Sequence, residues 1–155
     1  MNHQEITISK LLIKKSKTIA VAESCTGGLL SNLLTNIPGS SKYFLLGIVA
    51  YSNKAKISIL KIPAKIIKTH AVVSKQVAGL MAKNVRELAA SDYGIGISGI
   101  AGPSGGTPKK PIGTVYISLA TKNKLSTKKY HFAGSRVTIK RKTAILAFSN
   151  LKKLL

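Results

Sequence analysis

The chain has 155 residues, of which 45% are hydrophobic, and its 25 basic and 4 acidic residues give a formal net charge of +21. This length is typical of one domain with a substantial core, and we expect a single domain over residues 1–155. No carboxylate follows Asp92, so the composition excludes paired-carboxylate hydrolysis, two-metal phosphoryl transfer and calcium binding, all of which need clustered acids.

The large positive charge has two possible origins. Nucleic acids and membrane surfaces attract basic proteins. Here, however, the cations are mostly lysines spread along the whole chain, without a dense arginine tract. Such a spread is typical of a compositional bias, and we therefore expect neither a nucleic-acid nor a membrane partner. A positive field of this kind still attracts small anions, phosphates included.

The few cysteines and histidines narrow the chemistry further. Cys25 is the single cysteine, which excludes an intramolecular disulfide and favours a reducing, cytoplasmic setting. The histidines, His3, His70 and His131, are scattered and lack the spacing of zinc ligands. No apolar run approaches the ~20 residues of a membrane helix.

The apolar pattern predicts strands that alternate with helices over the first hundred residues. Residues 18–22 form an apolar run of strand length, and residues 27–35 carry leucines at helical spacing. Residues 44–51 are nearly all apolar, which predicts a strand that is central in its sheet and covered on both faces. A short helix is expected over residues 53–60.

The second half of the chain continues this alternation. Ser74 is expected to cap a longer helix whose apolar stripe includes Leu88. Residues 93–98 predict a third strand, and a glycine-rich loop follows over residues 99–113. The remaining predicted elements are two strands over 113–120 and 126–132, paired as a hairpin, and a terminal helix over 138–155. Together these elements predict a three-layer α/β/α sandwich with a mixed, mainly parallel sheet and an antiparallel edge.

Ser24 lies where the first predicted strand gives way to a helix. Helix N-termini present free N–H groups and a partial positive charge, so a serine there has donors for the oxyanion formed when it attacks a carbonyl. Gly27 and Gly28 let the backbone approach a substrate closely. Alternatively, Ser24 and Thr26 only cap the helix. Cys25 is a rival nucleophile if the helix lowers its thiol pKa, or else a small buried hydrophobe.

Two lysines follow the second predicted strand. Lys54 and Lys56 lie close to Tyr51 in the sequence, and a lysine made neutral by burial or by neighbouring cations can act as a general base. The tyrosine hydroxyl could relay or orient the proton. Glu23, one of only four acids, is expected to orient this lysine or to pair with a cation in the core. In a lysine-rich chain, a solvated surface role is the alternative for each lysine.

Two glycine-rich patterns are interpreted as decoys. Residues 94–99 match the G-x-G-x-x-G fingerprint, but they lie within a predicted strand, and Pro103 follows where a helix should begin. No acid follows at the position that holds a ribose, so we predict no dinucleotide site. Residues 102–106 lack the lysine of a Walker loop, although their N–H groups could form an anion-binding nest.

Five segments together carry a resemblance. They are AESCTGG at 22–28, AYSNKAK at 50–56, SGIAGPSGG at 98–106, KPIGTVY at 110–116 and FAGSR at 132–136. Over residues 6–155 the chain closely resembles the C-terminal domain of the competence-damage-inducible CinA proteins, which includes the stand-alone nicotinamide-nucleotide amidases. The resemblance implies this domain alone, without the nucleotide-hydrolase domain of longer members. It also implies hydrolysis of nicotinamide mononucleotide to nicotinate mononucleotide and ammonia, in pyridine nucleotide salvage.

The resemblance also implies roles for individual residues. In its serine–lysine mechanism Ser24 is the nucleophile, Lys56 the base and Tyr51 the assisting tyrosine, and no metal or organic cofactor is implied. We expect self-association, most simply as a dimer. The residues implied in substrate binding are Thr26, Gly27, Gly28, Ser98, Gly99, Gly102, Ser104, Gly105, Gly106 and Arg136.

The chain departs from the family pattern at several positions. Ser135 stands where the family commonly has an aspartate, Lys140 where it has an arginine, and Ala71 and Val72 where it has Gly-Ala. These departures bear on substrate affinity more than on the nucleophile. The alternatives are a catalytically weak or inactive module that binds nucleotides or nucleic acid, and an amidase for a related pyridine substrate.

Overall fold

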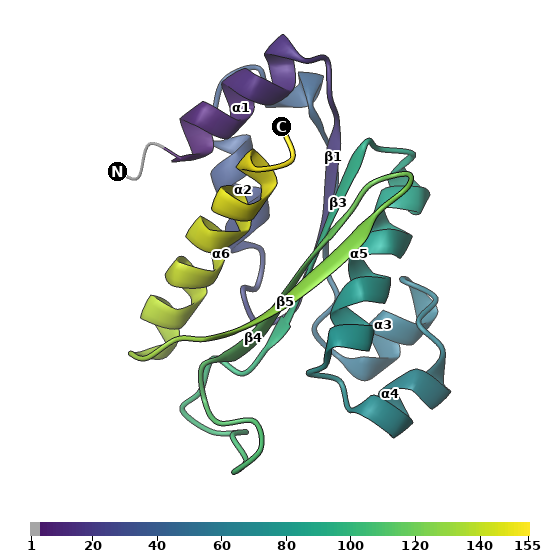
Figure 1. The fold of residues 1–155 in the computed structure, drawn as a ribbon, viewed down its shortest axis with the longest axis vertical. Coiled ribbons are helices and arrows are strands. Elements are labelled where there is room, and N and C mark those ends of the chain that lie inside the picture. The colour runs from purple at the N-terminus through teal and green to yellow at the C-terminus, as the bar shows by residue number, and fades with distance from the viewer. Residues whose placement is uncertain (1–3) are drawn as a thin grey trace.

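The computed structural model describes residues 4–155 and shows a five-stranded sheet with helices on both faces (Figure 1). The strand order is β2-β1-β3-β4-β5, and the strands are β1 (Ile19–Glu23), β2 (Phe44–Val49), β3 (Tyr93–Gly99), β4 (Thr114–Ala120) and β5 (Leu125–His131). β1 pairs in parallel with β2 and β3, and the β4–β5 hairpin joins β3 in antiparallel fashion. Among the described strands only β4 is therefore reversed, and the predicted mixed, mainly parallel sheet is confirmed.

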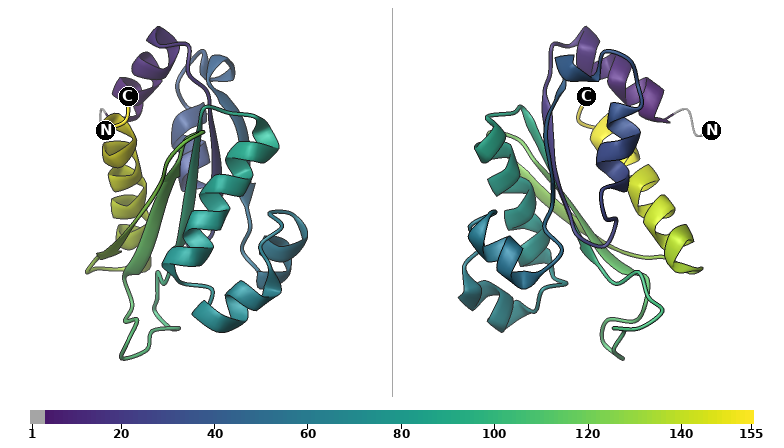
Figure 2. Two further views of the ribbon diagram at one scale, coloured as in Figure 1. Left: turned by 45° about the vertical axis from the view of Figure 1, so that its right-hand side comes forward. Right: turned by 180° about the vertical axis from the view of Figure 1, so that it is seen from behind.

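The helices form two layers around this sheet. Figures 1 and 2 show helices on both faces of the sheet. One layer contains α1 (Gln4–Lys14), α2 (Leu29–Thr35) and α6 (Arg136–Lys152); the other contains α3 (Asn53–Ser58), α4 (Ala64–His70) and α5 (Lys75–Ala89). Each layer closes its own hydrophobic cluster, with Leu12, Leu34 and Phe148 in the first and Val77 and Met81 in the second. The predicted α/β/α sandwich is confirmed.

Small residues in β3 explain how α5 packs on the sheet. A Cβ atom on Gly94 would collide with the Ala82 carbonyl of α5, and one on Gly96 would collide with the Ala78 carbonyl. Glycine is therefore required where the helix backbone lies against the strand. The G-x-G-x-x-G pattern lies in β3 and serves helix packing, which agrees with the prediction that it is not a nucleotide fingerprint.

Two predictions about burial were wrong. β2 is an edge strand rather than a central one, and its residues alternate between half-buried and exposed. An apolar run does not reveal whether a strand pairs with other strands on both of its edges or on one only. The strand whose residues are all buried is β1. Leu88 was placed on the buried stripe of α5 but is 59% exposed. The close contacts of α5 with β3 run from Ala78 to Arg86, one turn short of the helix end.

The helix boundaries differ in smaller ways from those predicted. The helix capped by Ser74 is confirmed, with the Ser74 hydroxyl accepting from the N–H of Val77. The terminal helix begins at Arg136 and ends at Lys152, earlier than expected at both ends. Helices α1 and α4 were not predicted. Within residues 4–155 no helix is long and apolar enough to cross a membrane.

Candidate active site

A pocket lies at the carboxyl ends of the three parallel strands. Ser24 follows β1, Tyr51 follows β2 after one intervening residue, and Ser98 and Gly99 end β3. The carboxyl ends of parallel strands meet at one edge of a sheet, where α/β proteins commonly bind ligands. The cavity measures about 370 Å³, and Arg136 at the start of α6 completes its wall. In Figure 1 this edge faces the β3–β4 loop at the foot of the molecule.

Lys56 reaches Ser24 from the first turns of α3. The Ser52 side chain caps that helix by accepting from the N–H of Ala55 at 3.0 Å. Lys56 is 1% exposed, and its Nζ lies 3.0 Å from Ser24 Oγ. The same Nζ donates to the backbone carbonyls of Ala50 at 2.7 Å and Tyr51 at 3.2 Å. A neutral amine has two N–H groups and one lone pair, so the two carbonyls can hold its hydrogens while the lone pair faces the serine hydroxyl.

Burial lowers the pKa of Lys56 below its ordinary value of 10.5. The charged form is disfavoured because the ammonium is removed from water. The ion pairs within residues 4–155 join Lys17 to Asp92 and Arg86 to Glu87, so no carboxylate offsets this effect at Lys56. The geometry and the pKa direction together suit a lysine that accepts a proton from Ser24.

Glu23 does not orient the lysine, and both roles expected for it were wrong. Its fully buried carboxylate accepts from the backbone N–H groups of Gly28 at 3.1 Å, Leu30 at 3.1 Å and Ser31 at 2.8 Å. It also accepts from the Ser31 hydroxyl at 2.7 Å. The carboxylate thus caps α2 from the last residue of β1. Because the turn between β1 and α2 is short, the side chain of Glu23, the last residue of β1, lies beside the N–H groups at the start of α2.

This cap changes the expected source of oxyanion donors. The first N–H groups of α2 are occupied by Glu23. The residue that precedes α2 is Gly28, so the alternative in which Ser24 and Thr26 cap the helix is also wrong. Within residues 4–155, the N–H groups of Cys25 and Thr26 have no backbone acceptor. These two groups, in the turn itself, are the donors available beside Ser24.

The surroundings of Cys25 disfavour it as a competing nucleophile. Burial raises the pKa of its thiol to about 12. A thiol with that pKa stays protonated near neutral pH, and the thiolate is the reactive form. The interpretation of Cys25 as a small buried hydrophobe agrees with this environment.

Arg136 and Tyr51 are joined across the mouth of the pocket. The Arg136 guanidinium donates to the Gly102 carbonyl and to the Tyr51 hydroxyl, each at 2.7 Å. The tyrosine hydroxyl therefore contacts the arginine, while the tyrosine carbonyl contacts Lys56. Ser135, where the resemblance implies an aspartate, caps α6 by accepting from the N–H of Thr138 at 3.3 Å. The helix that carries Arg136 thus keeps its cap without a carboxylate beside the guanidinium.

The residues predicted to bind substrate, apart from Arg136, fall into two groups. Gly99, Gly102, Ser104 and Gly105 line the pocket together with Ser98. Gly102 and Gly105 have φ values of 78° and 89°, a region that favours glycine. Thr26, Gly27, Gly28 and Gly106 lie outside the lining.

The glycines outside the lining serve turns and close packing. Gly27 and Gly28 have φ values of 62° and 92° and turn the chain from Ser24 into α2. A Cβ atom on Gly27 would lie 3.4 Å from the Lys140 Nζ, so this second family departure sits beside the turn. Gly106 packs against Ile112.

One part of the pocket wall was noted in the sequence only as a departure from the family pattern at Ala71 and Val72, and not as a lining segment. The segment between α4 and α5 contributes Val72 and Val73. The Ser98 hydroxyl donates to the Val72 carbonyl at 2.7 Å, and Lys110 Nζ donates to the Val73 carbonyl at 2.6 Å. Ser98 and Lys110 each lie in a recognised motif, but nothing local in those motifs indicates the partner segment.

The part of the chain that the structure describes contains no group of three histidine, cysteine, aspartate or glutamate side chains that could hold a metal. His3, one of the three histidines, lies outside the described residues.

Comparison with curated proteins identifies relatives over nearly the whole chain. A family model described as the CinA C-terminal domain matches residues 2–155. A "CinA-like protein" of Thermotoga neapolitana is 48% identical over 149 residues, which cover 96% of this chain and 36% of the relative. A "putative competence-damage inducible protein" of Caldanaerobacter subterraneus subsp. tengcongensis is 47% identical over 152 residues, covering 98% and 37%. The chain thus spans about a third of the length of the curated relatives it matches.

Solved structures with the same architecture agree with the fold. The competence damage-inducible protein A from Klebsiella pneumoniae matches with a TM-score of 0.94 at 30% identity, over 97% of this chain and 94% of that chain. A CinA superfamily protein from Escherichia coli matches with a TM-score of 0.94 at 33% identity, over 98% and 88%.

Proposed function

The chain belongs to the CinA C-terminal domain family, and from that premise we propose that it is a nicotinamide-nucleotide amidohydrolase. It would convert nicotinamide mononucleotide and water into nicotinate mononucleotide and ammonia, as a step of pyridine nucleotide salvage. The observation that carries the proposal is the 3.0 Å contact between Lys56 Nζ and Ser24 Oγ inside a pocket at the sheet edge. A cytoplasmic setting is part of the proposal, because a charged nucleotide does not cross membranes unaided.

Acylation follows from this contact. Ser24 Oγ attacks the carboxamide carbon while its proton passes to the neutral amine of Lys56. The carbonyl π electrons move to oxygen, and the N–H groups of Cys25 and Thr26 are the donors that would stabilise the oxyanion. The Lys56 ammonium then donates its proton to the amide nitrogen. The C–N bond breaks, and ammonia leaves an ester on Ser24.

Deacylation uses the same pair in reverse. Water attacks the ester carbon and gives a proton to the neutral Lys56 amine. When the tetrahedral intermediate collapses, Lys56 returns that proton to Ser24 Oγ, and the carboxylic acid is released and ionises. Lys56 thus ends the cycle neutral, as it began. The carbonyls of Ala50 and Tyr51 keep its amine in place throughout.

The basic wall of the pocket suits the phosphate of the substrate. Arg136 has five N–H groups, and within residues 4–155 its recorded bonds are to Gly102 and Tyr51. The remaining donors of the guanidinium could bind phosphate oxygens, together with backbone N–H groups of the glycine loop. In this proposal Tyr51 assists in two ways: its hydroxyl positions Arg136, and its carbonyl positions Lys56.

Ammonia release from nicotinamide mononucleotide tests the proposal. Wild type should turn over, while Ser24→Ala and Lys56→Met should each lose activity by at least about a thousandfold. Lys54→Met is the matched control, because Lys54 is exposed on the same helix and loses the same charge. Nicotinamide and nicotinamide riboside, assayed in parallel, distinguish a nucleotide amidase from one acting on a related amide.

The proposed amidase activity would be contradicted by the following result. No ammonia release by wild type between about pH 6 and pH 10, combined with steeply salt-dependent DNA binding, would favour a non-catalytic binding module.

Self-association, most simply as a dimer, is also a proposal, and sedimentation equilibrium of the wild type tests it.

A further inference from the structure

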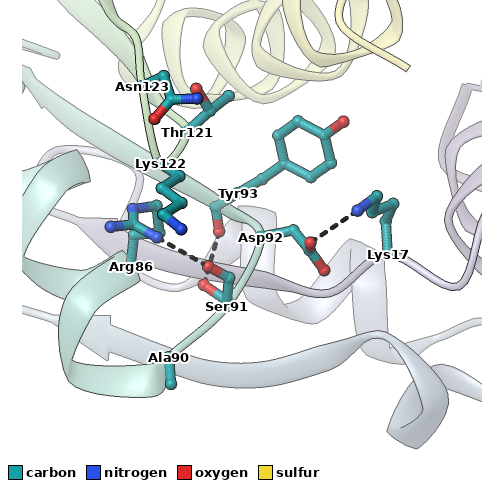
Figure 3. Close-up of a pocket in the computed structure, with 9 residues that line it drawn as sticks. All are labelled: Lys17, Arg86, Ala90, Ser91, Asp92, Tyr93, Thr121, Lys122 and Asn123. Carbon is teal, nitrogen blue, oxygen red and sulfur yellow. Dashed lines mark hydrogen bonds and ion pairs between the residues drawn. The ribbon is translucent and has the colours of Figure 1, made fainter.

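A second cavity lies at the end of the sheet opposite Ser24. It is lined where the chain enters β1 and β3, where α5 ends and where β4 turns into β5. These are the amino ends of the parallel strands, whereas the Ser24 pocket lies at their carboxyl ends. The cavity measures about 400 Å³, and Figure 3 shows its side chains. This volume lies within the range of pockets that bind small molecules.

The residues that line the cavity carry a net positive charge. Its charged residues are Lys17, Arg86, Lys122 and Asp92. Asp92 accepts from Lys17 Nζ at 2.9 Å and from the N–H and hydroxyl of Thr18 at 2.9 and 3.0 Å. The aspartate and Lys17 therefore neutralise each other. Arg86 has a distant partner in Glu87, which lies 4.0 Å away and outside the lining, and Lys122 makes no ion pair among residues 4–155.

Arg86 is only partly satisfied by the protein. Its side chain is 17% exposed, and its Nη1 donates to the Ser91 carbonyl at 3.2 Å. The nearest carboxylate oxygen, on Glu87, is 4.0 Å from Nη2, beyond hydrogen-bond distance. Nε is buried and has no hydrogen-bond partner within the described chain. An unpaired buried donor on a cation is unfavourable unless an acceptor reaches it.

Lys122 approaches the same space from the β4–β5 turn. Figure 3 shows its ammonium and the Arg86 guanidinium directed into the same part of the cavity. Across residues 4–155 no hydrogen bond or ion pair is recorded for Lys122. The turn is closed by bonds between Thr121 and Lys124, which leaves the N–H groups of Lys122 and Asn123 without a backbone acceptor.

We propose that this cavity is a second anion site, separate from the Ser24 pocket, that binds the phosphate group of a small phosphorylated compound. Two cations and neutral amide donors suit a dianion with several oxygens. The cavity also has room beyond one phosphate, and Tyr93 supplies an aromatic wall for a nucleoside-sized body. This site does not depend on the proposed amidase activity.

Amide chemical shifts measured during titration test the site. The probes are inorganic phosphate and adenosine monophosphate, each added at constant ionic strength to the wild-type chain. Saturable shifts are expected for residues 90–93 and 121–124, with a dissociation constant of about 1 mM or below. Amides around Ser24 and the glycine loop report separately on the other pocket, so failure of one site is distinguishable from failure of the other.

Three variants make the test specific. Arg86→Gln should weaken binding by about tenfold, and Lys122→Gln by about fivefold. Lys122 is exposed in a turn, so its variant tests the site even if Arg86→Gln impairs folding. Lys75→Gln is the control, because it removes the same charge from the other end of α5, about 16 Å from Arg86 along the helix. Its affinity should change less than about twofold.

The two probes also divide the outcomes. Equal affinity for phosphate and adenosine monophosphate would support a site for the phosphate group alone, and tighter binding of the nucleotide would support a nucleotide-sized ligand. Absence of saturation up to about 50 mM phosphate would overturn the proposal. Equal weakening by Lys75→Gln would also overturn it. The proposal would also be overturned if a short single-stranded DNA changed amide chemical shifts across all lysine-bearing surfaces while phosphate changed none.

Discussion

Replacing Glu23 should destabilise the turn that carries Ser24. The carboxylate accepts four hydrogen bonds of 2.7 to 3.1 Å, three from backbone N–H groups and one from a hydroxyl. Glu23→Ala leaves those donors without an acceptor, and a buried unsatisfied donor costs about 1–3 kcal/mol. Leu30 is a buried residue, whereas Gly28 and Ser31 are only partly buried. We therefore expect a loss of about 3–4 kcal/mol.

Glu23→Gln provides the finer comparison. Its amide oxygen can still accept, but its NH2 group turns a donor toward N–H groups that are themselves donors. We expect a loss of about 2–3 kcal/mol. For a chain of this length each kcal/mol lowers Tm by about 2–4 °C, so alanine should lower Tm by about 10 °C and glutamine by about 7 °C. The assay is urea and thermal unfolding followed by circular dichroism.

Glu87→Gln is the matched control for Glu23. Glu87 has a side chain that is 51% exposed, so the same change of charge should alter stability by less than about 0.5 kcal/mol. Glu23 also positions the turn that carries Ser24, so its glutamine variant should lower kcat for the proposed amide hydrolysis more than it changes KM. A Tm for both Glu23 variants within about 2 °C of wild type would refute the capping role.

Three further changes test other parts of the structure. Because burial lowers the pKa of Lys56, kcat/KM should rise with pH through a pKa below 10.5 and then level off; a flat profile contradicts a neutral-lysine base. Between its lowered folded-state pKa and 10.5 the unfolded state binds more protons at this lysine, so wild-type stability should rise with pH in that window in a way that Lys56→Met does not. Arg136→Lys should raise KM about tenfold with little change in kcat, since an ammonium cannot hold Gly102, Tyr51 and a phosphate together; an unchanged KM counts against the phosphate role. Gly96→Ala should cost about 3 kcal/mol or more, measured by urea unfolding, because its Cβ would collide with the backbone of α5.

The order of strands and helices could largely be predicted from the chain alone. Apolar runs, turn residues and the Ser74 cap act over a few residues, so their effect is visible locally. Ser24 and Lys56 were recognisable through their motifs, and the structure brings them within 3.0 Å of each other. Their catalytic roles remain a proposal.

Other features depended on contacts that sequence periodicity does not contain. The position of β2 at the sheet edge depends on which strands pair, not on its own apolar run. Glu23 appeared to be a partner for a lysine, because a sequence does not reveal that the next helix starts within reach of its carboxylate. Which groups satisfy a buried charge such as the Glu23 carboxylate depends on the three-dimensional packing around it.

The amino-acid sequence by itself determined most of the local elements, the family and the identity of the candidate site residues. Only the tertiary structure decided their surroundings: a lysine buried against two carbonyls, a thiol kept protonated, and Tyr51 bonded to Arg136 across 85 positions of chain. The physical reason is that burial and hydrogen bonding act through space. The protonation state of a side chain therefore depends on neighbours that can lie anywhere along the chain.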